Sequence, residues 1–174
     1  VKDGVVSATW DGATSTLAGK NVLIAPTSGT STLTLPTSVE IGDNTVITFK
    51  TAFATRNCVQ PRYFEFYDSN GNKVIDDVIG FSWSTLYVGG TVGNKGIDNS
   101  TGHFDGAAPV GSWAGDITIT LNKTTGKGTV AFGTETSVEI TLSSSATDIA
   151  SIKLNSKSGA GVDRMFGLTD IIIK

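Results

Sequence analysis

The pattern that decides the fold is ITITLNKTTGKGTVAF, residues Ile117–Phe132. Apolar and polar residues alternate on both sides of a turn that contains Gly126, which is typical of two adjacent antiparallel strands with one buried face. A second hairpin is expected in YFEFYDSNGNKVI, residues Tyr63–Ile75, because the Asn70-Gly71 step tolerates the backbone angles of a tight turn. Both stretches predict an all-β protein.

The same alternation recurs along nearly the whole chain of 174 residues, interrupted at short intervals by turn residues. The expected strands are Val5–Trp10, Val22–Ala25, Thr32–Leu35, Thr45–Ala54, Tyr63–Asp68, Lys73–Asp77, Gly80–Val88, Asp116–Asn122, Lys127–Phe132, Ser137–Leu142, Ile149–Asn155 and Met165–Ile173. About a dozen strands predict two packed sheets, because one open sheet of that size would leave a face uncovered. We therefore expect a two-sheet antiparallel β-sandwich in which residues 1–174 form a single domain.

Charge and composition narrow the range of partners. The 13 Lys and Arg residues are scattered singly and the net charge is −3, so no basic stripe is available for nucleic acid. The longest apolar runs are only a few residues, too short to cross a membrane. The chain begins at Val1, and its Ser/Thr-rich, Lys-poor composition leads us to expect a mature module of a secreted bacterial protein.

Few residues are suited to standard active-site chemistry. The single cysteine, Cys58, excludes an internal disulfide, and the single histidine, His103, excludes paired imidazoles and a zinc site of the Cys/His kind. Glu135 and Glu139 share an expected strand, but four residues place them about 13 Å apart, beyond the roughly 5 to 9.5 Å of a glycosidase pair. These shortages predict a protein that is not an enzyme, with a small lyase or hydrolase as an alternative.

Alternation along YFEFYD separates two kinds of aromatic residue. Phe64 and Phe66 share one face, which we expect to meet the other sheet. Tyr63, Glu65 and Tyr67 share the opposite face, where two phenol rings flank a carboxylate. Flat rings suit the apolar faces of sugars and a carboxylate suits their hydroxyls, so this face is a candidate glycan-binding surface.

A second group of aromatic residues lies in the expected strand Gly80–Val88. Trp83 and Tyr87 share one of its faces and are the preferred candidates for stacking on sugars. Arg62 and Arg56 precede or begin the YFEFYD strand and are candidates for hydrogen bonds to hydroxyls. The alternative is that these rings simply fill the core of a large sandwich.

A structural calcium ion is a further expectation, because oxygen-rich loops often fix strand ends in extracellular β-sandwiches. Asp170 enters the last strand, and it would meet Asp11 or Asp3 if the two ends of the chain paired in one sheet. No other cofactor is expected.

Three stretches carry a resemblance to a known family: YFEFYDSNGNKV (Tyr63–Val74), WAGDITITL (Trp113–Leu121) and FGLTDIIIK (Phe166–Lys174). In order, they resemble the jelly-roll, concanavalin-like carbohydrate-binding modules of bacterial enzymes that degrade plant polysaccharides. The resemblance implies a jelly roll and a non-catalytic module, tethered as a monomer to a catalytic domain, that binds plant cell-wall polysaccharide of the β-glucan, xyloglucan, mannan or xylan type. The alternative function is a structural or adhesin-like surface domain with a protein partner.

Overall fold

The structure is a computed structural model of the chain. It describes residues 8–17, 20–24, 26, 29–53, 62–82, 85–88, 97–98, 115–133, 137–156 and 166–174. Strands are the only regular secondary structure in these ranges, and none of their residues forms a helix that could span a membrane.

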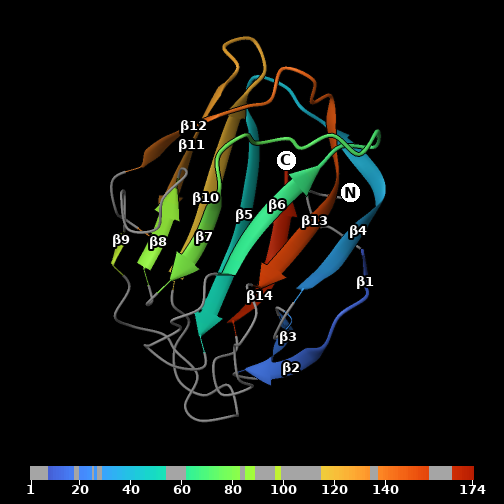
Figure 1. The fold of residues 1–174 in the computed structure, drawn as a ribbon, viewed down its shortest axis with the longest axis vertical. Coiled ribbons are helices and arrows are strands. Elements are labelled where there is room, and N and C mark those ends of the chain that lie inside the picture. Colours follow the sequence, from blue (N-terminus) through green and yellow to red (C-terminus); the bar gives the residue numbers. More distant parts are fainter. Residues whose placement is uncertain are drawn as a thin grey trace.

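Two antiparallel sheets of seven strands each lie face to face (Figure 1). The front sheet contains, in spatial order, β1 (Thr9–Trp10), β4 (Gly29–Glu40), β13 (Asp148–Ser156), β6 (Arg62–Tyr67), β7 (Ile79–Ser82), β8 (Thr85–Val88) and β9 (Ile97–Asp98). The back sheet contains β12 (Val138–Thr141), β11 (Lys127–Phe132), β10 (Gly115–Asn122), β5 (Thr45–Phe53), β14 (Phe166–Ile173), β3 (Lys20–Ile24) and β2 (Thr14–Leu17). The chain passes repeatedly between the sheets, which makes the fold a jelly roll and confirms the predicted β-sandwich.

The core lies between the sheets and is built from the apolar positions of the alternating pattern. Ile117 and Ile119 of β10 and Phe64 and Phe66 of β6 are all buried and belong to one core cluster. Phe49 of β5 meets Phe64 edge to face, with ring centroids 5.2 Å apart. This pair joins the two sheets at the level of β6, so one face of β6 is fixed against the core.

The hairpin predicted from Ile117–Phe132 is confirmed. β10 pairs with β11 in continuous register from Ile117 opposite Phe132 to Asn122 opposite Lys127, and Gly126 has a positive φ of 65° in the turn.

The second predicted hairpin is right at its turn and wrong beyond it. Gly71 has a φ of 83°, but pairing stops after a single bridge between Tyr67 and Lys73, so the predicted strand Lys73–Asp77 does not form. Instead the chain crosses toward the back sheet, where Ile75 bridges Leu142. A carboxylate oxygen of Asp77 accepts a hydrogen bond from the Thr141 N–H at 2.6 Å. The crossing segment thereby covers the edge of β12, which protects a strand edge from outside pairing.

The predicted single strand Gly80–Val88 is also wrong. β7 and β8 pair with each other, with Phe81 opposite Leu86 and Gly80 opposite Tyr87. Because opposite residues share a face and neighbours alternate, positions 81 and 87 are out of phase and do not form one aromatic row. β2 was not predicted, and the short β9 lies inside a glycine-rich stretch that shows no periodicity.

Candidate functional site

The candidate site is the outer face of β6 in the front sheet. Phe64 and Phe66 are buried, whereas Tyr63, Glu65 and Tyr67 point away from the core and are half-buried. The two faces are therefore those predicted from the alternation in YFEFYD. We call the outer residues of β6 and those that contact them the β6 face.

The register adds residues of β13 and β4 to this surface. Tyr63 lies opposite Asn155 of β13, which lies opposite Thr30 of β4. Glu65 lies opposite Lys153 in the same way. The β6 face thus combines three strands that are far apart in the sequence.

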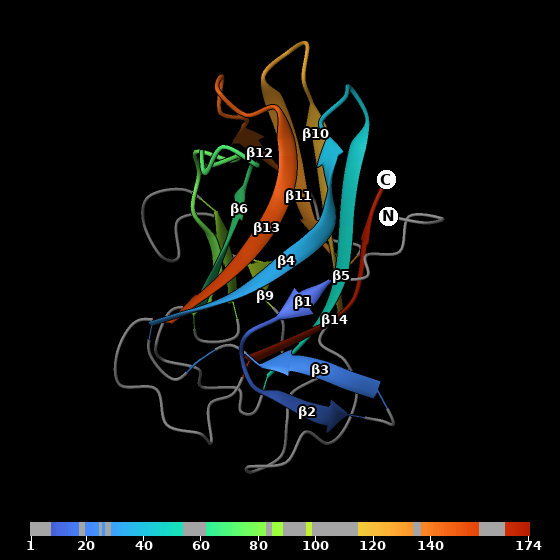
Figure 2. The same ribbon diagram turned by 90° about the vertical axis from the view of Figure 1, so that its right-hand side faces the viewer.

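The front sheet is curved where these strands run. Figure 2 shows β4 and β13 bowing toward the back sheet, so that their concave side is the outer side. The ladder between them is interrupted between Ile149 and Ser151, and Pro36 of β4 lies opposite this interruption. Because proline cannot donate a ladder hydrogen bond, the break in pairing has a local cause.

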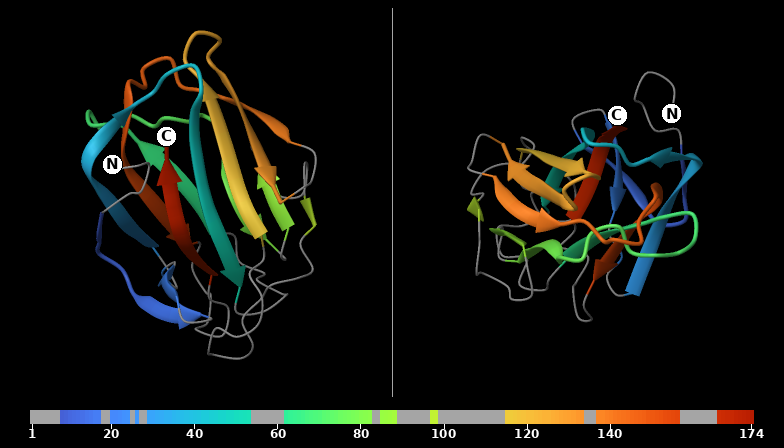
Figure 3. Two further views of the ribbon diagram at one scale, coloured as in Figure 1. Left: turned by 180° about the vertical axis from the view of Figure 1, so that it is seen from behind. Right: turned by 90° about the horizontal axis from the view of Figure 1, so that it is seen from above.

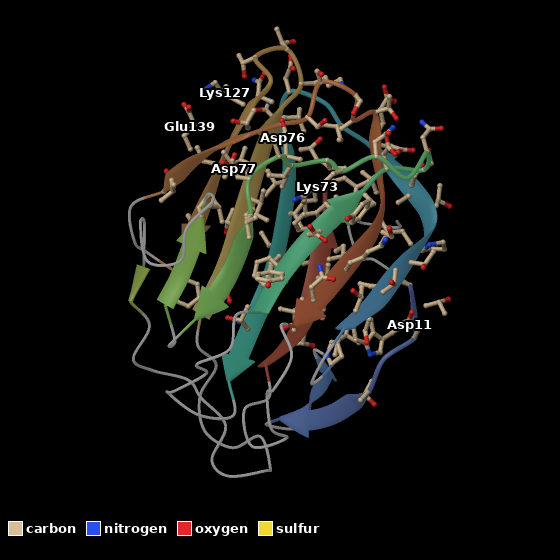
Figure 4. The ribbon with its side chains drawn as sticks, viewed as in Figure 1. Asp11, Lys73, Asp76, Asp77, Lys127 and Glu139 are labelled. Carbon is tan, nitrogen blue, oxygen red and sulfur yellow. The ribbon has the colours of Figure 1, made fainter. Side chains whose placement is uncertain are left out.

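Glu65 is the centre of a hydrogen-bond network on the β6 face. One carboxylate oxygen lies 3.2 Å from the ammonium nitrogen of Lys73, which Figure 4 shows at the end of β6. The other oxygen accepts a hydrogen bond from the Asn155 side-chain amide at 2.8 Å and one from the Tyr67 hydroxyl at 3.2 Å. The Thr30 hydroxyl in turn donates to the Asn155 side-chain oxygen at 2.5 Å. These contacts hold five polar side chains in one arrangement.

Tyr67 is fixed at both its hydroxyl and its ring. The ammonium nitrogen of Lys153 lies 4.1 Å from the centroid of the ring, a cation–π contact. Burial raises the pKa of Tyr67, and the charge of Glu65 and the hydrogen bond to it raise the pKa further. One face of this ring is therefore occupied by a neighbour within the protein.

Tyr63 has a different environment. It lies between Asn155 on one side and Gly80 of β7 on the other, and the backbone of Tyr87 follows beyond Gly80 in the register. Gly80 has no side chain and is itself buried. Tyr63 is half-buried, and because Lys153 covers one face of the Tyr67 ring, Tyr63 is the better candidate on the β6 face for a flat ligand.

The structure describes the remaining predicted binding residues only in part. Arg56 and Trp83 lie outside the described residues. Arg62 begins β6, one position out of phase with Tyr63, and Tyr87 lies in β8, but the side chains of both are outside the description.

The predicted calcium ligands remain a prediction. β1 pairs with β4 in the front sheet and β14 pairs with β3 and β5 in the back sheet, so the two chain ends do not pair in one sheet. Trp10, which precedes Asp11, and Asp170 nevertheless line the same cavity. A carboxylate oxygen of Asp11 accepts the Thr32 N–H at 2.6 Å, and Asp3 lies outside the described residues. Within the described ranges, no three His, Cys, Asp or Glu side chains are grouped as metal ligands.

Sequence reasoning missed Lys73, Lys153, Asn155 and Thr30. The alternation in Ile149–Asn155 puts Lys153 and Asn155 on an outer face, which is a usable signal. Nothing local indicates that this strand pairs with β6, since Asn155 and Glu65 are 90 residues apart.

Comparison with known proteins places this fold among β-sandwich domains. No protein-family profile matches the sequence, and no curated protein matches it. Among solved structures, the potassium-bound carbohydrate recognition domain of Emp46p matches with a TM-score of 0.61 at 11% identity, over 95% of this chain and 87% of that one. The binding domain of botulinum neurotoxin serotype D (TM-score 0.58, 13% identity) is matched over 99% of this chain and 45% of its own length. A sialidase (TM-score 0.57, 8% identity) is matched over 88% of this chain and 15% of its own length. At these identities the likeness concerns the fold.

Proposed function

We propose that the protein binds a glycan on the β6 face and does not cleave it. The observation that carries the proposal is the ordered polar network around Glu65, placed beside Tyr63 on the concave side of the front sheet. Fixed polar groups next to an aromatic ring form the combination that polyhydroxylated rings require.

In the proposed complex a sugar ring lies on Tyr63. An aromatic contact of this kind contributes about 1 kcal/mol. The ring hydroxyls would donate to Glu65 and accept from the amide of Asn155 and the ammonium of Lys153. A carboxylate offers about four acceptor positions, and the contacts from Lys73, Tyr67 and Asn155 orient Glu65 without using all of them. Tyr67 acts in this proposal as a support for Glu65.

The structural neighbours support glycan binding as the class of function. Two of them are named as carbohydrate recognition domains, of Emp46p and Emp47p. The Emp47p domain matches with a TM-score of 0.59 over 99% of this chain and 89% of its own length. A whole domain of this fold is therefore used elsewhere as a carbohydrate recognition unit.

The finer proposal concerns the ligand and the setting. We propose a plant cell-wall polysaccharide of the β-glucan, xyloglucan, mannan or xylan type, bound by a monomeric, secreted bacterial module tethered to a catalytic domain. This rests on the sequence resemblance given above. Trp83, Tyr87, Arg62 and Arg56 remain proposed as further contacts, and a structural calcium ion involving Asp170, Asp11 or Asp3 remains a proposal.

Affinity electrophoresis tests the proposal. The protein is run through gels that each contain xyloglucan, β-glucan, glucomannan, xylan or homogalacturonan, and we expect retardation in one gel of the first four. Incubation with the same polysaccharide should release no new reducing ends and no unsaturated products. Free migration in all gels would favour the structural or adhesin-like alternative, and released products would favour a lyase or hydrolase.

Two variants locate the site. Tyr63→Ala should weaken binding about fivefold to tenfold, as expected from the loss of one stacked ring. Thr118→Ala is the control, because Thr118 is half-buried on the outer side of β10 in the back sheet. Equal retardation of the two variants would show that the β6 face is the wrong surface.

A further inference from the structure

Two lysine residues and one glutamate carry the described charges of the β6 face. Lys73 lies 3.2 Å from Glu65 and forms an ion pair within the face. Lys153 of β13 lies opposite Glu65 in the register, but its ammonium group lies over the Tyr67 ring. These three charged side chains together carry a net charge of +1, although the whole chain has a net charge of −3. A positive surface on a negative protein favours an anionic ligand at this place.

Lys153 provides the ammonium group that a ligand can use. Among the described residues it forms no ion pair, and its contact with Tyr67 uses the face of a ring and not an acceptor atom. An ammonium group has three N–H donors. Because the Tyr67 hydroxyl donates to Glu65, the ring that Lys153 contacts is itself held in place. Lys153 is therefore a positioned cation without a carboxylate partner in the part of the chain that the structure describes.

The position of Lys153 relative to Tyr63 suits a ligand that carries its charge close to a flat ring. Asn155 lies opposite Tyr63, and Lys153 precedes Asn155 by two residues on the same outer face. Tyr63 and Lys153 are therefore diagonal neighbours on adjacent strands, about 7 to 8 Å apart. A uronic acid carries its carboxylate directly on the sugar ring. Such a ring on Tyr63 brings its carboxylate within reach of the ammonium group at the end of the long Lys153 side chain.

Neighbouring carboxylates limit how many charges the ligand can carry. In the order β6, β13, β4 and β1, Lys153 lies on the second strand and Glu65 on the first. Asp11 follows β1 at the other edge of β4, where its carboxylate accepts the Thr32 N–H at 2.6 Å. Both carboxylates repel further anionic groups. The surface therefore suits an occasional carboxylate and not a chain that carries one on every sugar.

We propose that the glycan bound on the β6 face carries isolated uronic acid residues and that Lys153 binds their carboxylate. The inference rests on the proposed function, since it concerns the same surface. Among the proposed ligands it selects a xylan with glucuronic acid side groups, in which the carboxylates are spaced along a neutral backbone. Tyr63 stacks on the acidic ring in this arrangement, and Lys153 supplies the charged contact.

Calorimetric titration with two matched oligosaccharides tests the proposal. The first is a xylo-oligosaccharide with one glucuronic acid side group, and the second is the same compound after reduction of its carboxyl group to a primary alcohol. We expect the acid to bind about fivefold to tenfold more tightly, since only the acid makes a charge-assisted contact. An increase in sodium chloride from about 0.05 M to about 0.5 M should remove most of this difference, because salt screens exposed charges.

Two variants of Lys153 and one control separate charge from structure. Lys153→Met removes the ammonium group, so we expect this variant to bind the two oligosaccharides equally. Lys153→Arg keeps the charge and the contact with an aromatic ring, and it should retain the preference for the acid. Lys127→Met should also retain the preference, because Lys127 is exposed at the start of β11 in the back sheet, which faces the viewer in the left view of Figure 3.

The possible failures distinguish this inference from the proposed function. Equal affinity of the unaltered protein for the two oligosaccharides would overturn the inference and leave glycan binding intact. Unchanged preference in Lys153→Met, or tighter binding of an oligogalacturonate with a carboxylate on every sugar, would also overturn it. If neither xylo-oligosaccharide binds, the inference is wrong, and the gels decide separately about the proposed function: retardation by another polysaccharide supports it and free migration in all gels rejects it.

Discussion

Replacement of Glu65 by glutamine removes one charge from the centre of the β6 face and keeps the shape of the side chain. An amide accepts hydrogen bonds at its oxygen only, whereas Glu65 uses one oxygen for Tyr67 and Asn155 and the other for Lys73. If the amide oxygen stays with Tyr67 and Asn155, the amide NH2 group faces the ammonium group of Lys73, so two donors meet. Because the side chains of Glu65 and Lys73 are only 25% and 31% exposed, we expect the loss to be about 1 to 2 kcal/mol.

Urea denaturation followed by tryptophan fluorescence measures this loss. The matched control is Glu139→Gln, which breaks the contact of Glu139 with Lys127 at 2.6 Å at the edge of the back sheet (Figure 4). That pair is 66% and 53% exposed, so its removal should cost less than about 1 kcal/mol. If Glu65→Gln is no less stable than Glu139→Gln, the network around Glu65 does not order the β6 face.

The same variant changes the titration of Tyr67. The raised pKa of Tyr67 comes first from burial and then from the charge of Glu65 and the hydrogen bond to it, so the variant should titrate at a lower pH. The folded pKa exceeds the ordinary value of about 10. The contribution of Tyr67 to stability is therefore complete below that pH and is lost as the pH rises through the folded value. Tyrosinate absorbance should show the lower pKa of Tyr67 in Glu65→Gln. Identical titrations of the variant and the unaltered protein would show that Glu65 does not raise the pKa of Tyr67.

Two further predictions concern the rest of the fold. Hydrogen bonds from the backbone and hydroxyl of Thr124 lower the pKa of Asp43. The ionised Asp43 therefore stabilises the fold above its ordinary pKa, and this stabilisation is lost as the pH falls through the lowered pKa. The urea midpoint of the unaltered protein should fall between about pH 6 and about pH 3, and that of Asp43→Asn should fall less. Gly128→Ala would place a methyl group 2.5 Å from the Thr120 carbonyl oxygen and should destabilise by about 1 to 3 kcal/mol. Gly42→Ala, whose methyl would meet only the Thr45 hydroxyl at 4.0 Å, should leave the melting temperature nearly unchanged, and equal melting temperatures of the two alanine variants would contradict the packing described.

Local pattern was sufficient to predict which residues face the core. Alternation in YFEFYD correctly separated Phe64 and Phe66 from Tyr63, Glu65 and Tyr67, because the side-chain period of a strand does not depend on its partners. The turn at Gly71 was likewise visible, but the following residues pair elsewhere, and Ile75 meets Leu142 of a distant segment.

Pairing between distant strands was not predictable in the same way. Lys153 and Asn155 belong to the β6 face only because β13 lies between β4 and β6. The register of β14 against β5 shifts between Thr169 and Ile172, and no residue pattern in the chain predicts this shift. These features depend on the fold as a whole, so a search for site residues by strand phase alone finds only part of the site.

The central claim is that a glycan lies on the β6 face, and chemical-shift mapping tests it most directly. The labelled protein is titrated with an oligosaccharide of the polysaccharide that retards it in gels. We expect the largest shifts at Tyr63, Glu65, Lys153 and Asn155, with little change on the outer side of β10. Shifts concentrated on the back sheet, with none on β6 and β13, would contradict it.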